Sequence, residues 1–380
     1  MKYLFLLITI IVFPIFSFAQ QTINGSISHD GLERDYILYV PANYSGNTEV
    51  PLILNFHGFG SNATEQMFYG DFRSIADTAG FIVVHPQGTL FNGITHWNVG
   101  GWTIGSTTDD VGFSEALIDS LAAEYNIDET RVYSTGMSNG GFMSFVLASQ
   151  LSEKIAAIAS VTGSMTPETY NNSNPQHPTP ILQMHGTSDG VVPYNGVFFS
   201  LPIVDVIDYW VEYNVCNTTP TITALPDIAP NDGSTVEHFV YSDGGNGVNV
   251  EHYKITGGGH TWPGSAFGGA GTNMDINASA EIWNFLSRYD INGLIVTTGI
   301  EQTQRKDMFL KLFPNPTNSA ITINGGLTFP AEYVLLSPEG KKIIQGIFTS
   351  NNQQIDLSNL SPGLYYLKIH GKVYKVLKSN

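Results

Sequence analysis

The sequence predicts an α/β protein with a mainly parallel central sheet, followed by a small all-β sandwich. Between residues 36 and 288, short apolar runs alternate with helical stretches, which is typical of a parallel sheet covered by helices. After residue 307 only short strands separated by turns follow. Residues 20–303 carry six basic and 29 acidic side chains (net −23), whereas residues 304–380 carry nine and four (net +5). We therefore expect two domains, 20–296 and 307–380, joined by a polar linker at 297–306.

Local periodicity places the individual elements. Residues 111–125 are expected to form a helix with Phe113, Leu117 and Leu121 on one face and Asp109 or Asp110 as its N-cap. Strands of the first domain are expected at 36–40, 52–54, 81–84, 131–135, 181–184 and 248–255, and strands of the second at 320–323, 333–336, 342–344, 354–357, 364–369 and 373–376.

The composition excludes several classes of function. The 380-residue chain has 16 basic and 33 acidic side chains, a net charge of −17. Nucleic acids and anionic membranes both bind cationic surfaces, so we expect neither as a partner. With 42% hydrophobic residues the chain can bury a large core. Cys216 is the only cysteine, which excludes an intrachain disulfide and a thiolate metal cluster, and we expect it to fill space in the core.

The first 19 residues have the features of a signal peptide. Lys2 precedes an apolar run over residues 3–18, and the small residues Ser17 and Ala19 stand at the spacing that signal peptidase reads. A membrane anchor is the alternative. However, the run is shorter than the roughly 20 residues of a spanning helix, and Pro14 interrupts it. We therefore expect cleavage near Ala19–Gln20 and an exported protein without a stable membrane span.

One glycine-rich turn carries the main chemical signal. Ser138 lies in Gly136-Met137-Ser138-Asn139-Gly140-Gly141, between an expected strand and an expected helix. A serine in such a turn is typical of a nucleophile elbow, where only glycines fit the tight backbone and the hydroxyl stands above the sheet. An ordinary glycine-rich turn is the alternative, because Gly and Ser are common in turns.

Two later loops complete a catalytic triad in the order Ser, Asp, His along the chain. Asp189 follows the expected strand at 181–184, and His260 lies in the run Gly257–Gly264 after the strand at 248–255. Loops at strand ends are where α/β sheets place their active sites. We predict that Ser138 is the nucleophile, that His260 takes its proton, and that Asp189 orients His260.

Backbone N–H groups are expected to form the oxyanion hole. The first is that of Asn139, the residue after the nucleophile. The second is expected from the loop after the strand at 52–54, with Phe59 as the donor and Gly60 as the alternative. His57 lies in the same loop, but it precedes the serine in the chain, so we expect a structural role for it.

Other candidates are less specific. Trp97, Trp102 and Trp262 flank the expected site loops and are predicted to line an aromatic substrate cleft, whereas Trp210 and Trp283 are expected in the core. An acid/base pair at Asp109 and Asp110 is less favoured than helix capping, and calcium binding at 275–277 is less favoured than a solvated turn. We expect no metal and no cofactor.

Six motifs together resemble the polyhydroxybutyrate depolymerase/feruloyl esterase group of α/β-hydrolases, the LpqC-like branch akin to carbohydrate esterase family 1. The resemblance covers roughly residues 22–290 and implies a secreted serine esterase in which Ser138, Asp189 and His260 form the triad. Trp102 stands where some members carry cysteine. The motifs are His57–Gly60, Trp97-Asn98, Asp109–Phe113, Gly136–Gly141, His185–Asp189 and Gly259–Gly264.

The tail resembles a type A sorting domain of the type IX secretion system. Leu312-Phe313-Pro314-Asn315-Pro316, the run Gly363–Ile369 and a lysine-bearing last strand carry this resemblance, which covers about 310–380. It implies that the secretion machinery is a partner and that the protein reaches the cell surface or the medium. Without the resemblance, the tail reads equally well as a substrate-binding module.

These features predict a secreted carboxylic-ester hydrolase that works through an acyl-enzyme. The expected substrates are feruloyl or acetyl esters of plant polysaccharide, with a polyester such as polyhydroxybutyrate as the alternative. A peptidase is a less favoured member of the same fold. From a different class, a catalytically silent surface binding protein would have no need for all three triad residues.

Overall fold

The computed structural model describes residues 20–296, 311–324, 331–337, 341–350, 353–369 and 372–379. The expected signal peptide at 1–19 and linker at 297–306 lie outside these residues. The chain divides into two compact units, Met1–Ile295 and Val296–Asn380.

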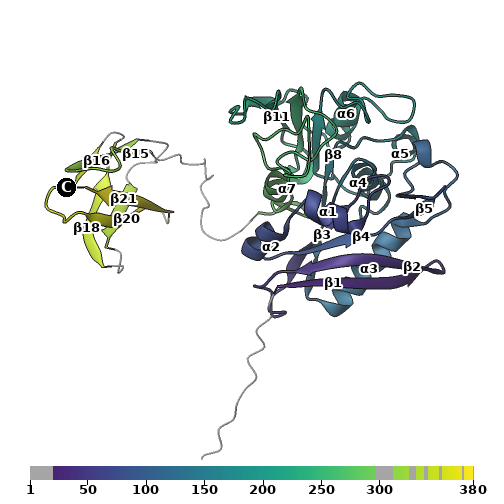
Figure 1. Ribbon diagram of the computed structural model, residues 1–380, viewed down its shortest axis with the longest axis horizontal. Coiled ribbons are helices and arrows are strands. Elements are labelled where there is room, and N and C mark those ends of the chain that lie inside the picture. Colours follow the sequence, from purple (N-terminus) through teal and green to yellow (C-terminus); the bar gives the residue numbers. More distant parts are fainter. Residues whose placement is uncertain are drawn as a thin grey trace, which may run out of the picture. The chain divides into compact units, whose positions relative to one another are not determined.

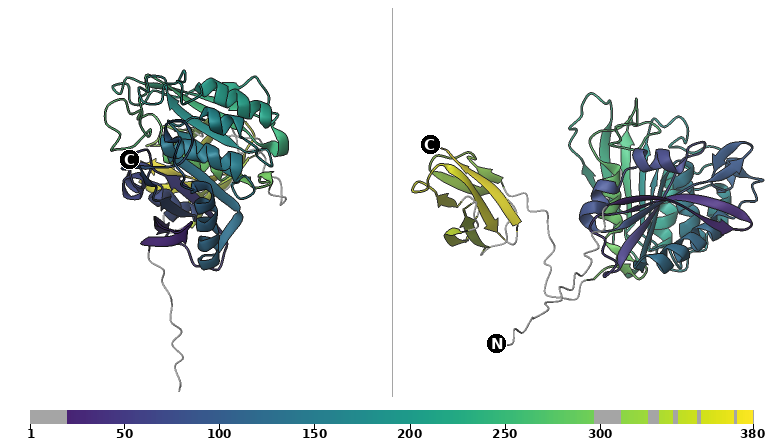
Figure 2. Two further views of the ribbon diagram at one scale, coloured as in Figure 1. Left: turned by 90° about the vertical axis from the view of Figure 1, so that its right-hand side faces the viewer. Right: turned by 60° about the horizontal axis from the view of Figure 1, so that its bottom comes forward.

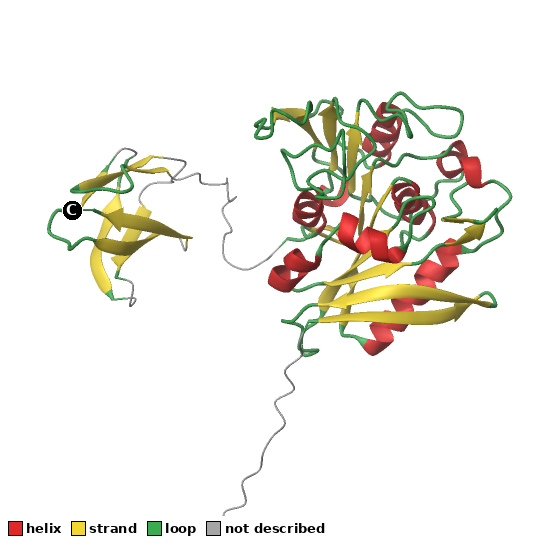
Figure 3. Ribbon diagram, viewed as in Figure 1, coloured by secondary structure: helices red, strands yellow, loops and turns green. Residues whose placement is uncertain are grey.

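The first unit is built on a ten-stranded sheet (Figures 1 and 3). Its six central strands are parallel, and two antiparallel strands extend it on each side. In spatial order the strands are β1 (Gln21–His29), β2 (Leu32–Val40), β4 (Ile82–Pro86), β3 (Val50–Phe56), β7 (Ile127–Met137), β8 (Ala157–Val161), β9 (Ile181–Gly186), β12 (Val250–Thr256), β11 (Thr235–Tyr241) and β10 (Thr221–Ala224).

Helices cover both faces of this sheet (Figure 2). In β3, Leu52 and Leu54 belong to one buried cluster and Ile53 to the other, as expected of a parallel strand buried on both sides. One face packs against α3 (Asp110–Glu124), α4 (Asn139–Gln150) and α6 (Ile203–Tyr213), with α5 (Pro167–Asn171) against α4; the other packs against α1 (Ala63–Tyr69), α2 (Arg73–Ala79) and α7 (Ala278–Leu286).

The predicted elements of this unit are present, and most extend a few residues beyond the predicted bounds. Asp109 is the N-cap of α3, because its carboxylate accepts the Gly112 N–H at 2.9 Å. The central strand β8, the edge strands β1, β10 and β11 and the helices α1, α2 and α5 were not predicted. Neither were the short elements β5 (Thr89–Phe91), β6 (Ile94–His96), β13 (Tyr289–Asp290), β14 (Gly293–Leu294), η1 (Gly101–Thr103) and η2 (Gly245–Gly247).

The second unit has two antiparallel sheets that share one apolar core, which confirms the predicted small β-sandwich. Ile321, Leu335 and Leu367 are wholly buried in that core. The sheets have the orders β15 (Lys311–Phe313), β16 (Ala320–Asn324), β19 (Gln354–Asp356) and β18 (Lys342–Phe348), β17 (Ala331–Leu336), β20 (Gly363–Ile369), β21 (Lys372–Lys378). Among the described residues of both units, no helix is long and apolar enough to cross a membrane.

Candidate active site

The three predicted triad residues lie at one edge of the central sheet. Ser138 follows β7, Asp189 follows β9 and His260 follows β12. In the sheet β8 lies between β7 and β9, and β12 pairs with β9. All these pairs are parallel, so the carboxyl ends of the strands lie at the same edge. That edge is where open α/β sheets bind ligands.

Ser138 has the backbone of a nucleophile elbow. Its φ and ψ are 54° and −119°, which an L-residue adopts only under strain. Its N–H donates to Val161 O at 2.8 Å, and α4 begins at the next residue. A Cβ on Gly136 would lie 2.6 Å from Phe56 O, and one on Gly140 would collide with the same oxygen. The glycines on both sides of Ser138 are therefore required for the turn to pack against β3.

Asp189 and His260 are joined by a hydrogen bond of 2.8 Å between Oδ2 and Nδ1. The other oxygen of Asp189, Oδ1, accepts the N–H groups of Val191 and Val192 at 2.8 and 2.9 Å. Burial alone would raise the pKa of the Asp189 carboxyl, but hydrogen bonds from His185 and His260 outweigh it and hold the pKa well below its usual range. Asp189 is thus an ionised carboxylate that orients the His260 ring through Nδ1, and Nε2 has no hydrogen-bond partner within residues 20–296.

No hydrogen bond joins Ser138 Oγ to His260 within residues 20–296. In hydrolases without bound substrate this bond is often long, and it tightens when the substrate binds. The structure therefore brings Asp189 and His260 into direct contact and places Ser138 at the same sheet edge.

His185 is a further member of the site, and it was not predicted as a functional residue. Its Nε2–H lies 2.8 Å from Val192 O and 3.3 Å from Asp189 Oδ2. Its Nδ1 accepts from Gln183 Nε2 at 3.0 Å, which fixes the neutral tautomer. The signal for it was its position four residues before Asp189, at the end of β9.

Two backbone N–H groups are free to form an oxyanion hole. Within residues 20–296, neither the Phe59 N–H nor the Asn139 N–H has an acceptor. The Gly60 N–H, by contrast, donates to Thr95 O at 2.8 Å. This difference favours Phe59 over Gly60 as the second donor. The Asn139 side chain holds the neighbouring loop through two hydrogen bonds with the Trp97 backbone, at 2.8 and 3.1 Å.

His57 is the first residue of the oxyanion loop and is wholly buried. Its Nε2 accepts the Gly88 N–H at 2.9 Å, so the proton is on Nδ1, which donates to Gly58 O at 2.7 Å. Burial lowers the pKa of His57 to about 4. The ring is therefore neutral and fully bonded, which agrees with a structural role.

Two of the three predicted substrate-binding tryptophans are buried, and the prediction is wrong for them. Trp97 has no exposed surface, and its Nε1–H donates to His57 O at 2.9 Å. Trp262 is 1% exposed, packs edge-on against Phe72 and donates its Nε1–H to Ser279 Oγ at 3.2 Å. Both rings stabilise site loops from within the core and leave no face open to a substrate.

Trp102 is half-buried and lies beside the oxyanion loop. Its ring meets those of Phe59, Phe142 and Phe199 edge to face, with centroids 6.4, 4.9 and 5.2 Å away. Phe142 lies in the first turn of α4, which begins directly after Ser138, and its N–H donates to Ser138 O. Phe199 and its neighbour Phe198 were not predicted as site residues, because their only signal in the sequence is an aromatic pair inside a loop without periodicity.

The remaining carboxylate candidates have structural partners. Asp110 is buried in an ion pair with Arg34 at 2.6 Å, and Asp275 accepts the N–H groups of Ile228 and Ala229. Within the described residues, no group of three or more His, Cys, Asp or Glu side chains could hold a metal ion. Cys216 is buried and free.

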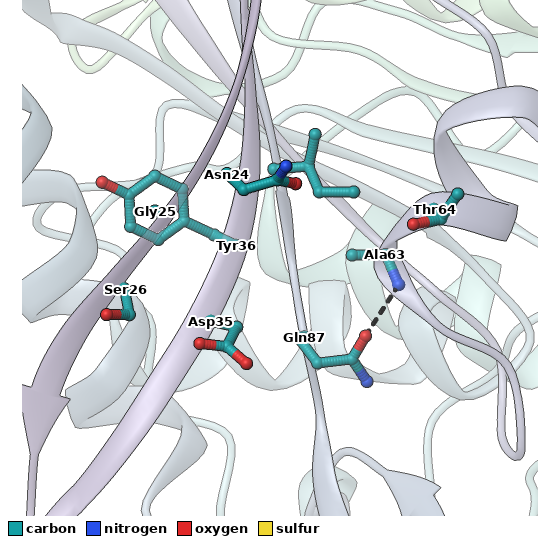
Figure 4. A pocket seen from close by; sticks show the side chains of 9 residues that line it. Asn24, Gly25, Ser26, Asp35, Tyr36, Ala63, Thr64 and Gln87 are labelled. Carbon is teal, nitrogen blue, oxygen red and sulfur yellow. Dashed lines mark hydrogen bonds between the residues drawn. The ribbon is translucent and has the colours of Figure 1, made fainter.

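A separate polar groove of about 490 Å³ lies between β1, β2 and α1 (Figure 4). None of the triad residues lines it. At its edge the Oε1 atom of Gln87 accepts the Ala63 N–H at 3.0 Å, shown as the dashed line in Figure 4. Gln87 thereby fixes the start of α1, directly after the oxyanion loop.

Comparisons with known proteins agree with this arrangement. Residues 104–199 match the Phospholipase/Carboxylesterase family, and residues 311–379 match the Secretion system C-terminal sorting domain. The bifunctional acetylxylan esterase/xylanase XynS20E of Neocallimastix patriciarum is 32% identical over 279 residues, 73% of this chain and 37% of that protein. Feruloyl esterase B of Piromyces equi is 29% identical over 238 residues, 60% of this chain and 42% of that protein.

The chain thus spans less than half the length of these two relatives. Among solved structures, an acetyl xylan esterase from Aspergillus awamori shares the fold with a TM-score of 0.50 at 14% identity, covering 71% of this chain and 99% of that one.

The first unit has the α/β-hydrolase fold. The chain is related to feruloyl and acetylxylan esterases, and it ends in a secretion sorting domain, so both predicted resemblances are confirmed. The sorting domain places the protein at the cell surface or outside the cell.

Proposed function

We propose that the protein is a secreted serine carboxylic-ester hydrolase. The observation that carries this proposal is the Asp189–His260 hydrogen bond of 2.8 Å at the sheet edge where Ser138 occupies a strained elbow. The kinship with esterases supports the same reaction. A catalytically silent binding protein would not need a histidine oriented by a buried carboxylate.

The reaction follows from the residues at this edge. Ser138 Oγ attacks the ester carbonyl carbon while His260 Nε2 takes the hydroxyl proton, and Asp189 stabilises the resulting imidazolium. The N–H groups of Phe59 and Asn139 bind the tetrahedral oxyanion. His260 then returns the proton to the leaving alkoxide, which departs as the alcohol. Water then attacks the acyl carbon while His260 takes one of its protons, and His260 returns that proton to Ser138 Oγ as the carboxylic acid departs.

The substrates we propose are feruloyl or acetyl esters of plant polysaccharide. The names of the two relatives support both acyl groups. The exposed ring of Phe59 in the oxyanion loop and the half-buried ring of Trp102 beside it support an aromatic acyl group in particular. The polyester alternative would gain apolar burial there but no aromatic pairing.

An ester panel tests the proposal. Purified residues 20–302 are assayed with methyl ferulate, an acetylated xylan fragment and a hydroxybutyrate oligomer. We expect the highest kcat/KM for one of the first two. Ser138→Ala should lower kcat by a factor on the order of 10⁶ while leaving the fold intact. If that variant kept more than a few per cent of the activity, Ser138 would not be the nucleophile.

The role of the second unit is tested by truncation near residue 302. Because the two units have separate cores, turnover of soluble esters should persist, and passage across the outer membrane of the native host should be lost. Loss of soluble-ester turnover in a folded truncation would mean that the tail helps to build the site.

A further inference from the structure

The loops around the candidate site carry almost no charge, although the domain as a whole is strongly acidic. Five segments contain no Lys, Arg, Asp or Glu at all: 50–64, 78–108, 132–152, 190–204 and 255–274. They hold the oxyanion loop, the β5–β6 hairpin with η1, the nucleophile elbow, the loop after Asp189 and the loop of His260. The net −23 of residues 20–303 therefore comes from other parts of the domain.

Large apolar side chains are exposed on the same loops. Phe198 is 90% exposed, Ile104 is 65% exposed, and Ile94 and Phe59 are 43% and 38% exposed. We call the six residues Phe59, Ile94, Trp102, Ile104, Phe198 and Phe199 the apolar rim.

Ring contacts link the four aromatic members of the apolar rim, and the two isoleucines belong to the same loops. Phe199 meets Trp102 and Phe198 edge to face, at centroid distances of 5.2 and 5.1 Å. Trp102 in turn meets Phe59, and Ile94 packs against the adjacent Gly60, where a Cβ would lie 3.5 Å from Ile94 Cγ2. Ile104 follows Trp102 by two residues, directly after η1.

Contiguous exposed apolar side chains beside a site are typical of surfaces that bind a partner or a substrate. We infer that the apolar rim docks the hydrolase onto the uncharged surface of a water-insoluble polymer that carries aromatic ester groups. This inference rests on the proposed esterase function, because the docked polymer is also the source of the scissile ester.

Charge and composition select this occupant. An anionic polymer would be repelled by the acidic domain, and a cationic one would be drawn to the acidic surfaces away from the site. Of the three kinds of polymer, an uncharged one is therefore the kind that would bind at the apolar rim. Four of the six rim residues are aromatic, and aromatic rings gain edge-to-face and offset-stacked contacts with other rings beyond what apolar burial provides.

The inference is tested by adsorption of the full secreted chain in a Ser138→Ala background, so that no ester is consumed. The probe is insoluble feruloylated arabinoxylan, and protein left in the supernatant is measured after centrifugation. The double variant Ile104→Ser/Phe198→Ser changes two exposed rim residues. We expect its apparent affinity for the solid to fall at least tenfold. Phe198→Tyr should retain most of the affinity.

A matched control removes two apolar residues away from the rim. Val215 and Ile222 are 76% and 54% exposed, and Val215→Ser/Ile222→Ser should leave adsorption unchanged. Equal loss in both double variants, or no loss in the rim variant, would overturn the inference. A rim variant that loses adsorption to a poly(3-hydroxybutyrate) film but not to arabinoxylan would assign the rim to a polyester and overturn the aromatic polymer. Failure of the proposed function is seen separately, as absent ester turnover in the wild type.

Discussion

Two histidines follow strands at the same edge of the sheet, in loops of similar composition, yet their surroundings differ. His57 follows β3 and is wholly buried, with both ring nitrogens bonded to backbone groups. His260 follows β12 and keeps 18% of its side chain exposed, and within residues 20–296 its one hydrogen bond runs from Nδ1 to the Asp189 carboxylate. The first ring has no nitrogen left for a substrate, whereas the second keeps Nε2 free.

The hydrogen-bond partners of the two rings distinguish the structural histidine, His57, from the catalytic candidate, His260. A backbone carbonyl and a backbone N–H fix the ring of His57 in a neutral form, and burial lowers its pKa to about 4. A carboxylate that stays ionised stabilises positive charge on His260 when a proton arrives. The two residues share their type and their position after a strand but differ in their hydrogen-bond partners. We therefore expect substitution of His260 to abolish activity with little loss of stability, and substitution of His57 to lower stability with little loss of activity.

The largest expected effect is that of His260→Ala. Removing the general base should lower kcat by a factor on the order of 10⁶, similar to loss of the nucleophile. Stability should change little, because Asp189 keeps hydrogen bonds from Val191, Val192 and His185. Burst kinetics with a chromogenic ester and urea unfolding measure the two quantities. Turnover within tenfold of wild type would assign the base to another residue.

Asp189→Asn should have the next largest effect. The amide can still bond to His260 but favours the wrong tautomer, so kcat should fall by a factor on the order of 10⁴. Ser188→Ala, a change at the neighbouring exposed position, is the control and should keep turnover within a few-fold. An Asp189→Asn variant with more than a tenth of wild-type kcat would show that the carboxylate charge is not needed.

The sequence was sufficient for the features that depend on backbone patterns. The elbow glycines, the order Ser138, Asp189, His260 and the parallel strands that bring these residues to one edge could all be predicted, because strand ends and tight turns have local signatures. The exposure of a tryptophan could not be predicted. Trp97 and Trp262 are in the expected loops, but whether a ring faces the substrate or the core depends on which distant elements cover it. For the same reason the role of His185 could not be predicted. Its hydrogen bonds to Gln183 and Val192 form only when the chain is folded.

Stability should depend on pH through histidines like His57. Burial lowers the pKa of His57 to about 4 and those of His85 and His252 to about 3, from an ordinary value of 6.5. Below pH 6.5 the unfolded chain therefore binds protons that the folded chain does not, so stability is full above pH 6.5 and is lost as pH falls. Each ring should weaken folding by roughly 2 kcal/mol at pH 5.

The measurement is the free energy of unfolding in urea at pH 7 and pH 5. It should fall by several kcal/mol in the wild type and by less in His252→Gln, which has one fewer such ring. An equal free energy at the two pH values would mean that these rings accept protons in the folded state.

The smallest expected effect, and the sharpest for the comparison, is that of His57→Ala. The variant removes the acceptor of the buried Gly88 N–H, which should cost about 1–3 kcal/mol of stability. The oxyanion loop keeps the Gly60–Thr95 and Ser61–Gly58 hydrogen bonds, so kcat/KM should stay within about tenfold when assayed well below the new Tm. His57→Gln provides an amide oxygen that can accept from Gly88 and should recover part of the stability. The two histidine variants should therefore differ in opposite ways from the wild type. His260→Ala should be stable but inactive, and His57→Ala should be active but less stable. A His57→Ala variant as stable as wild type and inactive would place His57 among the catalytic residues instead.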